Sequence, residues 1–142
     1  MKLRHSVQIA LTCFFVAFAY GTIRSGDVRR ALSFLMGQRI FIDHHLVNLG
    51  TVHNEQVLGI NIKIINLSTE SDTLIGVQAS CACLSINENL PLPIGPREAK
   101  DISLRMKAPK QLGRPFEIST TVLTQKSGSL RPTFKVIGQT RS

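Results

Sequence analysis

QVLGINIKIIN, residues 56–66, alternates apolar and polar side chains over most of its length. Successive side chains of a β-strand point to opposite faces of the sheet. Four apolar side chains of this stretch would therefore share one face: Leu58, Ile60, Ile62 and Ile64. A period of two over this length predicts a strand with one face in a hydrophobic core.

Other runs along the chain repeat this pattern, with proline, glycine and Asn/Ser clusters between them. Including residues 56–66, the predicted strands are Ile40–Val47, Gln56–Asn66, Thr73–Cys83, Ala99–Lys107, Phe116–Gln125 and Thr133–Gly138. Short strands at this spacing are typical of two packed sheets. We therefore predict an all-β fold, an antiparallel β-sandwich of six to eight strands.

An uncharged stretch of 18 residues, SVQIALTCFFVAFAYGTI, covers residues 6–23 between Arg4 and Arg24. As a helix it would span about 27 Å, close to the roughly 30 Å hydrocarbon layer of a bilayer. The same stretch fits a secretory signal, with small residues that would admit cleavage near Ala19. The sequence therefore predicts one N-terminal transmembrane or signal helix.

Three segments are expected along the chain. Residues 1–23 would form the membrane helix, as a signal anchor or a signal peptide, and residues 24–38 a helical stalk or linker, because their apolar side chains recur at helical spacing. Residues 39–142 would form the β-sandwich. We expect a single-pass membrane protein with its β domain outside the cytoplasm or, after cleavage near Ala19, a secreted or periplasmic protein.

The net charge of +8 at pH 7 is unevenly distributed. Residues 1–30 carry five basic and one acidic side chain, residues 31–96 two basic and five acidic, and residues 97–142 ten basic and three acidic. A basic half attracts anionic surfaces in general. Aromatic side chains do not interleave with these charges, as stacking on nucleic-acid bases would require. We predict a solvated basic surface and no nucleic-acid partner.

Within the β region, Cys81 and Cys83 are the side chains best suited to redox chemistry or metal binding. A strand that continued to Cys83 would place one row of side chains toward the core: Ile75, Val77, Ala79, Cys81 and Cys83. Three states are open, namely reduced core-packed cysteines, a Cys81–Cys83 disulfide, and a metal site. An extended strand separates the two Cα atoms by about 6.7 Å, whereas a disulfide needs Cβ atoms about 4 Å apart. A disulfide would therefore require a bulge or turn at Ala82.

A metal site on these cysteines would need more ligands than the domain readily supplies. Closed zinc sites have four ligands, and the histidines of the domain are His44, His45 and His53. His44 and His45 are adjacent and would point to opposite faces of a strand. Two arrangements stay open: a site of Cys81, Cys83 and one histidine, and a site shared across a dimer that would suit a soft Cu(I) ion. We expect no metal or cofactor, and keep Cys81 and Cys83 as the candidate ligands for copper or zinc.

Enzymatic signatures are missing from the sequence. The acidic side chains are scattered and mostly border turns, and neither a Gly-x-Ser-x-Gly elbow nor a phosphate-cradling glycine-rich loop occurs. Asn66-Leu67-Ser68 matches an N-glycosylation acceptor, but we interpret it as a turn. We predict a protein that is not an enzyme.

The order of several short motifs resembles one bacterial family. The motifs are Leu49-Gly50-Thr51-Val52, Ser80-Cys81-Ala82-Cys83-Leu84, Leu92-Pro93-Ile94-Gly95-Pro96-Arg97-Glu98 and Phe134-Lys135-Val136-Ile137-Gly138. Over about residues 38 to 140 the chain is similar to the domain of unknown function family numbered 1573, found in envelope and secreted proteins. The resemblance implies an immunoglobulin-like sandwich outside the cytoplasm and carries over no catalytic residues.

These observations predict a noncatalytic, membrane-anchored, extracytoplasmic binding or structural module of the cell envelope. Its expected partner is a protein or an envelope polymer, with membrane contact through residues 6–23. Two surfaces are candidates for binding, the loop Leu84–Glu98 and the exposed edge beside Ile40–Val47. The alternative is a thiol redox or copper- or zinc-handling domain that uses Cys81 and Cys83.

Overall fold

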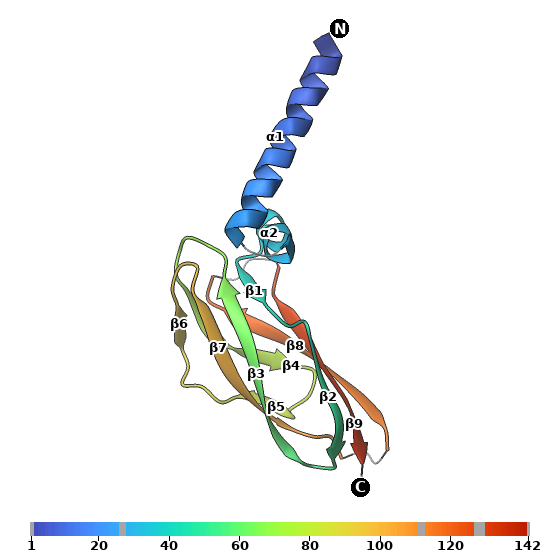
Figure 1. Ribbon diagram of the computed structural model, residues 1–142. Coiled ribbons are helices and arrows are strands. Elements are labelled where there is room, and N and C mark those ends of the chain that lie inside the picture. Colours follow the sequence, from blue (N-terminus) through green and yellow to red (C-terminus); the bar gives the residue numbers. More distant parts are fainter. Residues whose placement is uncertain (1, 26–27, 111–112, 127–129, 142) are drawn as a thin grey trace. The chain divides into compact units, whose positions relative to one another are not determined.

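The computed structural model describes residues 2–25, 28–110, 113–126 and 130–141, with side chains from residue 7 onward except those of residues 18 and 21–25. The chain divides into two compact units, Met1–Gly37 and Gln38–Ser142 (Figure 1). The first is helical and the second is built of strands, and each is described by itself.

The helical unit contains α1 (Lys2–Ser25) and α2 (Val28–Leu35). Large apolar side chains of α1 are more than half exposed: Val7, Ile9, Leu11, Phe14, Phe15 and Val16. Among the described residues, no helix meets the length and apolarity required to cross a membrane. The predicted spanning or signal segment, residues 6–23, includes side chains outside the described part of the chain, and it stays a prediction.

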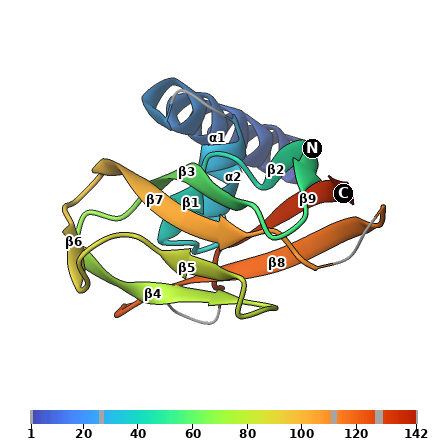
Figure 2. The ribbon, with the colours of Figure 1, turned by 90° about the horizontal axis from the view of Figure 1, so that it is seen from below.

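In the described residues the β unit forms nine strands in two sheets (Figures 1 and 2). Sheet A has the order β1 (Ile40–Ile42), β3 (Val57–Asn66), β7 (Ala99–Lys107), β5 (Leu84–Ile86). Sheet B has the order β2 (Leu46–His53), β9 (Thr133–Arg141), β8 (Pro115–Thr124), β4 (Asp72–Ala79), β6 (Leu92–Ile94). The predicted all-β sandwich is confirmed. The predicted strand number was too low, and the pairing is not wholly antiparallel because β2 runs parallel to β9.

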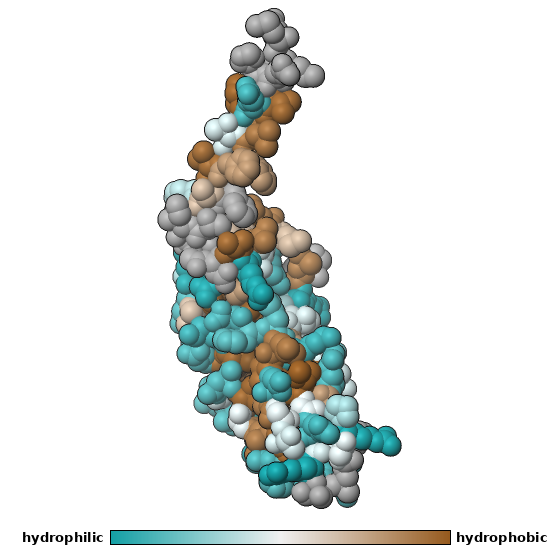
Figure 3. Space-filling model, turned by 45° about the vertical axis from the view of Figure 1, so that its right-hand side comes forward, coloured by the Kyte–Doolittle hydropathy of each residue, from teal (hydrophilic) through white to brown (hydrophobic). Residues whose placement is uncertain are grey.

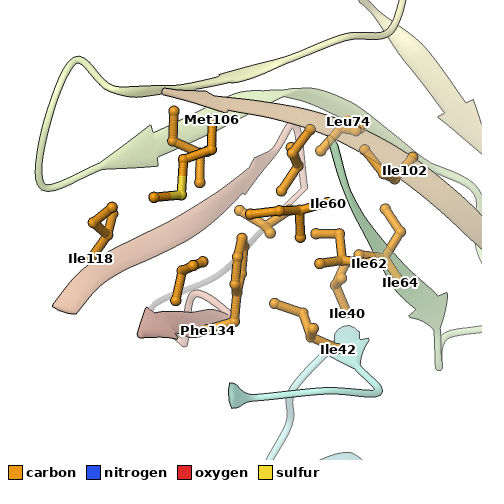
Figure 4. Close-up of a cluster of buried hydrophobic side chains, with 14 of the residues drawn as sticks. Ile40, Ile42, Ile60, Ile62, Ile64, Leu74, Ile102, Met106, Ile118 and Phe134 are labelled. Atoms are coloured by element: carbon orange, nitrogen blue, oxygen red, sulfur yellow. The ribbon is translucent and has the colours of Figure 1, made fainter. Parts of the chain in front are cut away.

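The core lies between the two sheets and is filled by the alternating inward residues of each (Figure 4). Sheet A contributes inward side chains from β3 and β7, among them Ile60, Ile62, Ile102 and Met106. Phe134 of β9 is the largest core side chain of sheet B and is 1% exposed. Buried and exposed side chains therefore alternate along β3 and β7, as the alternation of apolar and polar residues predicts.

The predicted strand Ile40–Val47 is divided between the two sheets. β1 pairs with β3 in sheet A, and β2 pairs with β9 in sheet B, so the chain crosses between the sheets at residues 43–45. The crossing coincides with a change from a wholly apolar run to Asp43, His44 and His45. All three residues of β1 are buried, while residues 44–46 are exposed. A polar triplet does not continue a buried strand, because its side chains would lose water without gaining partners.

The predicted strand Thr73–Cys83 differs in two respects. A register irregularity lies between Leu74 and Gly76, so Leu74 is buried and Ile75 is 52% exposed. The predicted inward orientation of Ile75 is therefore wrong, because one extra residue in a strand turns the following side chains to the other face. Val77 and Ala79 do pack against the core, as predicted.

A second irregularity separates the two halves of the β2–β9 pair, between Asn48 and Thr51. Gly50 lies there with φ at 63°, a backbone conformation that favours glycine. Gly138 of β9 lies close to Gly50, and the ring of Phe116 fills the space that a side chain at Gly138 would need. A Cβ at Gly138 would lie 2.6 Å from Phe116 Cζ and 3.2 Å from the Gly50 carbonyl oxygen.

Gly138→Ala should therefore destabilise the β unit by about 1–3 kcal/mol, because the added methyl group overpacks a filled site. The measurement is urea unfolding followed by circular dichroism. Gly59→Ala is the matched control, since a Cβ at Gly59 would meet no atom within 4 Å. Equal unfolding midpoints for the two variants would contradict this packing.

Candidate functional site

Ser80–Cys83 forms the crossover by which the chain leaves sheet B at the end of β4 and enters sheet A at β5. Backbone hydrogen bonds hold both ends of the crossover. Ser80 N donates to Ser119 O at 2.9 Å, and Lys107 N donates to Cys83 O at 2.7 Å. The Ser80 hydroxyl also accepts a bond from Ser119 N at 3.2 Å. The crossover is therefore anchored to β8 on one side and to β7 on the other.

Cys81 and Cys83 are joined by a disulfide within this crossover. Their Cα atoms are 5.2 Å apart, closer than the roughly 6.7 Å of an extended strand, because the chain turns at Ala82. The predicted strand thus ends at Ala79, and the two cysteines do not extend its row. Both are half-buried and pack against the core from the turn.

The sequence-predicted metal candidates are not assembled into a site. Among the described residues, no group of three or more His, Cys, Asp or Glu side chains is arranged to hold a metal ion. His45 packs edge-on against Phe41, with ring centroids 5.6 Å apart, and His44 lies 3.9 Å from the Asp43 carboxylate. A bonded pair of sulfur atoms also offers no thiolate, the form that binds metal.

Asn66 lies at the centre of a polar network that the sequence pattern does not reveal. It is fully buried, and its Nδ2 donates to the carbonyl oxygens of Glu70 at 2.7 Å, Gly95 at 2.9 Å and Ile94 at 3.4 Å. Its Oδ1 accepts from Ser68 N at 3.0 Å and from Ser68 Oγ at 2.8 Å. One side chain therefore joins the loop after β3 to the end of β6. With its amide nitrogen engaged and buried, Asn66 is a structural residue and does not present a glycosylation acceptor.

Asp72 joins two further segments to the same network. It is 3% exposed, and its carboxylate accepts bonds from Thr73 N at 2.7 Å, Thr124 Oγ1 at 2.8 Å and Lys126 N at 2.9 Å. These bonds attach the start of β4 to the end of β8. A buried carboxylate is tolerated because hydrogen bonds replace those it made to water.

Glu70 lies between two cations on the surface of this network. Its Oε2 is 3.2 Å from Arg39 Nη1 and 3.4 Å from Lys126 Nζ. Hydrogen bonds from Arg39 and then Lys126, followed by their charges, hold the pKa of Glu70 below its ordinary value. The two ion pairs attach the loop that carries Glu70 to Arg39 and to Lys126.

Because the pKa of Glu70 is lower in the folded state than in the unfolded state, folding stability decreases as this carboxylate becomes protonated. The contribution of Glu70 to stability is complete above its unfolded pKa, about 4.5, and is lost as the pH falls through the lower folded-state pKa. Glu70→Gln should therefore reduce the loss of stability between about pH 5 and pH 3, an effect kept small by solvent screening. Urea midpoints measured across this range provide the test. An unchanged pH profile would show that the two ion pairs contribute nothing.

The loop Leu84–Glu98, one of the two predicted binding surfaces, is more ordered than expected. β5 pairs with β7, and β6 pairs with β4, so residues 84–86 and 92–94 of this stretch belong to the sheets. Asn66 further fixes the carbonyl groups of Ile94 and Gly95. The segment between the two short strands, residues 87–91, remains as a connection with Leu90 37% exposed.

A hollow of about 560 Å³ lies along β2, β8 and β9. It occurs where β2 bulges away from β9, and its lining includes Asn48, Thr51, Phe116, Glu117, Ile137 and Gln139. Glu117 is already paired with Lys135 at 2.7 Å. The hollow offers one aromatic ring, two side-chain amides and the Glu117 carboxylate.

The arrangement defines a class: a small β-sandwich whose two sheets are joined by a disulfide-bonded crossover, with hydrogen-bonded end loops and, in the part of the chain that the structure describes, no group of side chains arranged to hold a metal ion. Several solved structures contain a β-sandwich of similar fold. The chain is similar to PapD-like domain 7 of human CEP192, at 10% sequence identity and a TM-score of 0.51, with 73% of this chain and 87% of that domain covered.

Similar structures also include parts of larger proteins. The YadV chaperone matches at 14% identity and a TM-score of 0.54, with 73% of this chain and 53% of YadV covered. A family 123 glycoside hydrolase from Clostridium perfringens matches at 10% identity and a TM-score of 0.55, with 76% of this chain and 24% of the hydrolase covered. The chain thus spans about half of YadV and a quarter of the hydrolase. At these identities the similarity establishes the fold alone.

No family model and no curated protein sequence matches the chain. The resemblance to family 1573 therefore rests on the motif residues, and it stays a prediction. The structure gives two of these motifs a physical role. Ser80–Leu84 forms the crossover between the sheets, and Leu92–Glu98 contains β6 and the carbonyl groups bound by Asn66.

Proposed function

We propose that this protein is a noncatalytic binding or structural module of the cell envelope, held at a membrane by residues 6–23 with its β unit outside the cytoplasm. The observation that carries the proposal is the Cys81–Cys83 disulfide. Disulfides persist in oxidising compartments such as the periplasm and the extracellular space, and are rare in the cytosol. The partner would be a protein or an envelope polymer.

The exposed apolar side chains of α1 support the membrane part of the proposal. Six of them between residues 7 and 16 are each at least 51% exposed, a costly arrangement in water. A bilayer would cover them on all sides of the helix. Release after cleavage near Ala19 would remove them instead, which is the secreted or periplasmic alternative.

Membrane fractionation with N-terminal sequencing and external protease digestion tests this placement. The proposal predicts a membrane-bound chain that retains residues 6–23, with a β unit that protease reaches from outside intact cytoplasmic membranes. A mature chain beginning near Tyr20 in the soluble envelope fraction would favour the cleaved form. A β unit protected by the cytoplasmic membrane would refute the proposal.

Binding itself is supported by the architecture. Sandwiches bind partners through end loops or by pairing a sheet edge with an extended segment. YadV, a chaperone, and a PapD-like domain of human CEP192 share this fold. Chemical cross-linking in intact cells, followed by purification of the full chain, should recover a protein or polymer partner. Recovery of the protein alone under conditions that capture known envelope complexes would contradict a binding role.

The disulfide is also the observation that favours a second function, thiol redox chemistry with Cys81 and Cys83. A bond between residues two positions apart constrains little unfolded chain, so its structural contribution is small. Replacing both cysteines with serine should lower the free energy of unfolding by about 1.5 kcal/mol or less. Under the binding proposal, partner capture by the double variant is unchanged. Loss of function in a variant of near-native stability would favour the redox function.

A further inference from the structure

Four of the strand edges in the β unit are short or blocked. β1, β5 and β6 have three residues each, and β6 contains Pro93. β2 is longer, but it contains a bulge, and two of its N–H groups donate hydrogen bonds to side-chain oxygens. Asn48 Oδ1 accepts from Gly50 N at 2.9 Å, and Gln56 Oε1 accepts from His53 N at 2.9 Å. Short strands, prolines and bulges are the devices by which sheets avoid unwanted edge pairing.

β3 has an edge without these protections. On one side β3 pairs with β7 along its whole length, from Val57 to Ile65. On its other side β1 pairs only with residues 64–66. No strand in the described chain pairs with residues 57–63 on that side. The edge is free because the chain crosses to sheet B at residues 43–45 instead of continuing beside β3.

The hydrogen-bond pattern identifies the free groups. Lys63 O accepts from Asp43 N at 3.1 Å on the β1 side, while Asn66 N donates to Glu98 O at 2.9 Å on the β7 side. Along a strand, each residue directs its N–H and C=O groups to the neighbour on one side, and the next residue directs its groups to the other side. The N–H and C=O groups of Val57, Gly59 and Asn61 therefore face the open side, and all three residues are exposed.

Apolar side chains accompany this edge. β2 connects to sheet A within three residues at each end, so the β2 edge and the β3 edge lie on the same side of the sandwich. Val47, Leu49 and Leu58 point inward from these strands and are half-buried. Figure 3 shows apolar surface in the middle of this side of the β unit. Residues 57–61 contain no charge and no proline.

We infer that the free edge of β3 binds an extended peptide segment of a partner protein, antiparallel to β3 and in line with β1. β1 already pairs with the far end of this edge, and its three side chains are 0–1% exposed. A segment in the same line would bond to Val57, Gly59 and Asn61 and turn alternate side chains toward Leu58 and Leu49. The expected ligand is therefore an extended peptide segment with an apolar residue at every second position. The inference rests on the proposed binding function and names its site.

The test measures binding of a labelled synthetic peptide to the full chain in detergent micelles, by fluorescence anisotropy. The peptide has about seven residues, the length of the open edge, with isoleucine alternating with threonine and glutamate at both ends to complement the basic protein. A peptide of the same composition with its isoleucines contiguous is the control ligand. We expect saturable binding of the alternating peptide and at least about tenfold weaker binding of the control.

Gly59→Pro removes one open N–H group without taking a bond from the β3–β7 pair, and should weaken binding of the alternating peptide at least about tenfold. Gly59→Ala keeps that N–H group and should bind as the native chain does. Should the proline variant not fold, hydrogen exchange on the native chain decides the matter. Bound peptide must then slow exchange at Val57, Gly59 and Asn61 while leaving the β2 amides unchanged.

Equal binding by native and proline variants, or protection at a different edge, would overturn the inference. A chain that dimerises through this edge and excludes the peptide would overturn the stated occupant. Absence of peptide binding, with a partner still recovered by cross-linking in cells, would reject this site and leave the proposed function standing. Absence of both would reject the proposed function as well.

Discussion

Phe134→Ala should lower the free energy of unfolding of the β unit by about 3–5 kcal/mol, the largest effect we expect from a single substitution. The ring is 1% exposed and lies among inward side chains of both sheets, including Ile42, Ile60 and Ile118 (Figure 4). Removing it deletes buried apolar contacts and leaves a cavity that close-packed neighbours fill only in part. Urea unfolding of the full chain, followed by far-ultraviolet circular dichroism, measures the change.

Phe134→Leu provides the matched comparison, since leucine retains part of the volume and should cost less than the alanine substitution. Leu130→Ala is the surface control, because Leu130 is 52% exposed and should change stability by about 0.5 kcal/mol or less. A loss below about 1 kcal/mol for Phe134→Ala would contradict a core centred between the two sheets.

Asn66→Ala should destabilise the β unit by about 2–4 kcal/mol. The substitution leaves the carbonyl oxygens of Glu70 and Gly95 and the N–H group of Ser68 without their side-chain partner. Unpartnered buried polar groups retain the full cost of leaving water. The loop after β3 and the end of β6 would also lose their common attachment. Equilibrium unfolding gives the size of the loss, and hydrogen exchange its location.

Asn66→Asp separates the contribution of the amide donor from that of side-chain packing. Aspartate has nearly the same size and shape, but it cannot donate a hydrogen bond when ionised. It would place a negative charge against carbonyl oxygens, so at pH 7 we expect destabilisation at least as large as that of alanine. Ser68→Ala removes one of the bonds to Asn66 Oδ1 and the two bonds between Ser68 Oγ and the Glu70 backbone, and should cost about 1–2 kcal/mol. Near-native stability of Asn66→Asp would refute the donor role of this residue.

The strands of the core were the most predictable part of the structure. The alternation of Leu58, Ile60 and Ile62 predicts both the strand and its buried face, since a sheet face repeats every second residue. The position of β1 and β2 was not predictable in the same way. Both halves of Ile40–Val47 suit a strand, and only the pairing of β1 with β3 and of β2 with β9 shows that they belong to different sheets.

The candidate site was less predictable because it depends on contacts between distant segments. Asn66 and Ser68 together signal a side-chain turn in the sequence, but the carbonyl group of Gly95 lies 29 residues away. The bulge at Leu74–Gly76 that exposes Ile75 is likewise set by pairing with β8. The turn at Ala82 brings Cys81 and Cys83 together, and a strand pattern that runs through Cys83 does not reveal it.

The open edge of β3 follows from the same sheet switch. Had residues 43–47 continued beside β3 in the register of β1, they would cover residues 59–63, including Gly59 and Asn61. The crossing to sheet B leaves these backbone groups free, and at the same time supplies β2 to cover the edge of β9. The crossing at residues 43–45 thus creates the open edge of β3 on which the proposed peptide binding depends.

The redox state and location of Cys81 and Cys83 in the cell test the proposed extracytoplasmic placement of the β unit. Cells producing the full chain are lysed in an alkylating reagent, fractionated, and the peptide containing Cys81 and Cys83 is analysed by mass spectrometry. An extracytoplasmic module on a membrane helix predicts that this peptide comes from the membrane fraction and is alkylated only after reduction. Recovery from the cytosolic fraction, with both thiols alkylated before reduction, would contradict a membrane-bound β unit outside the cytoplasm.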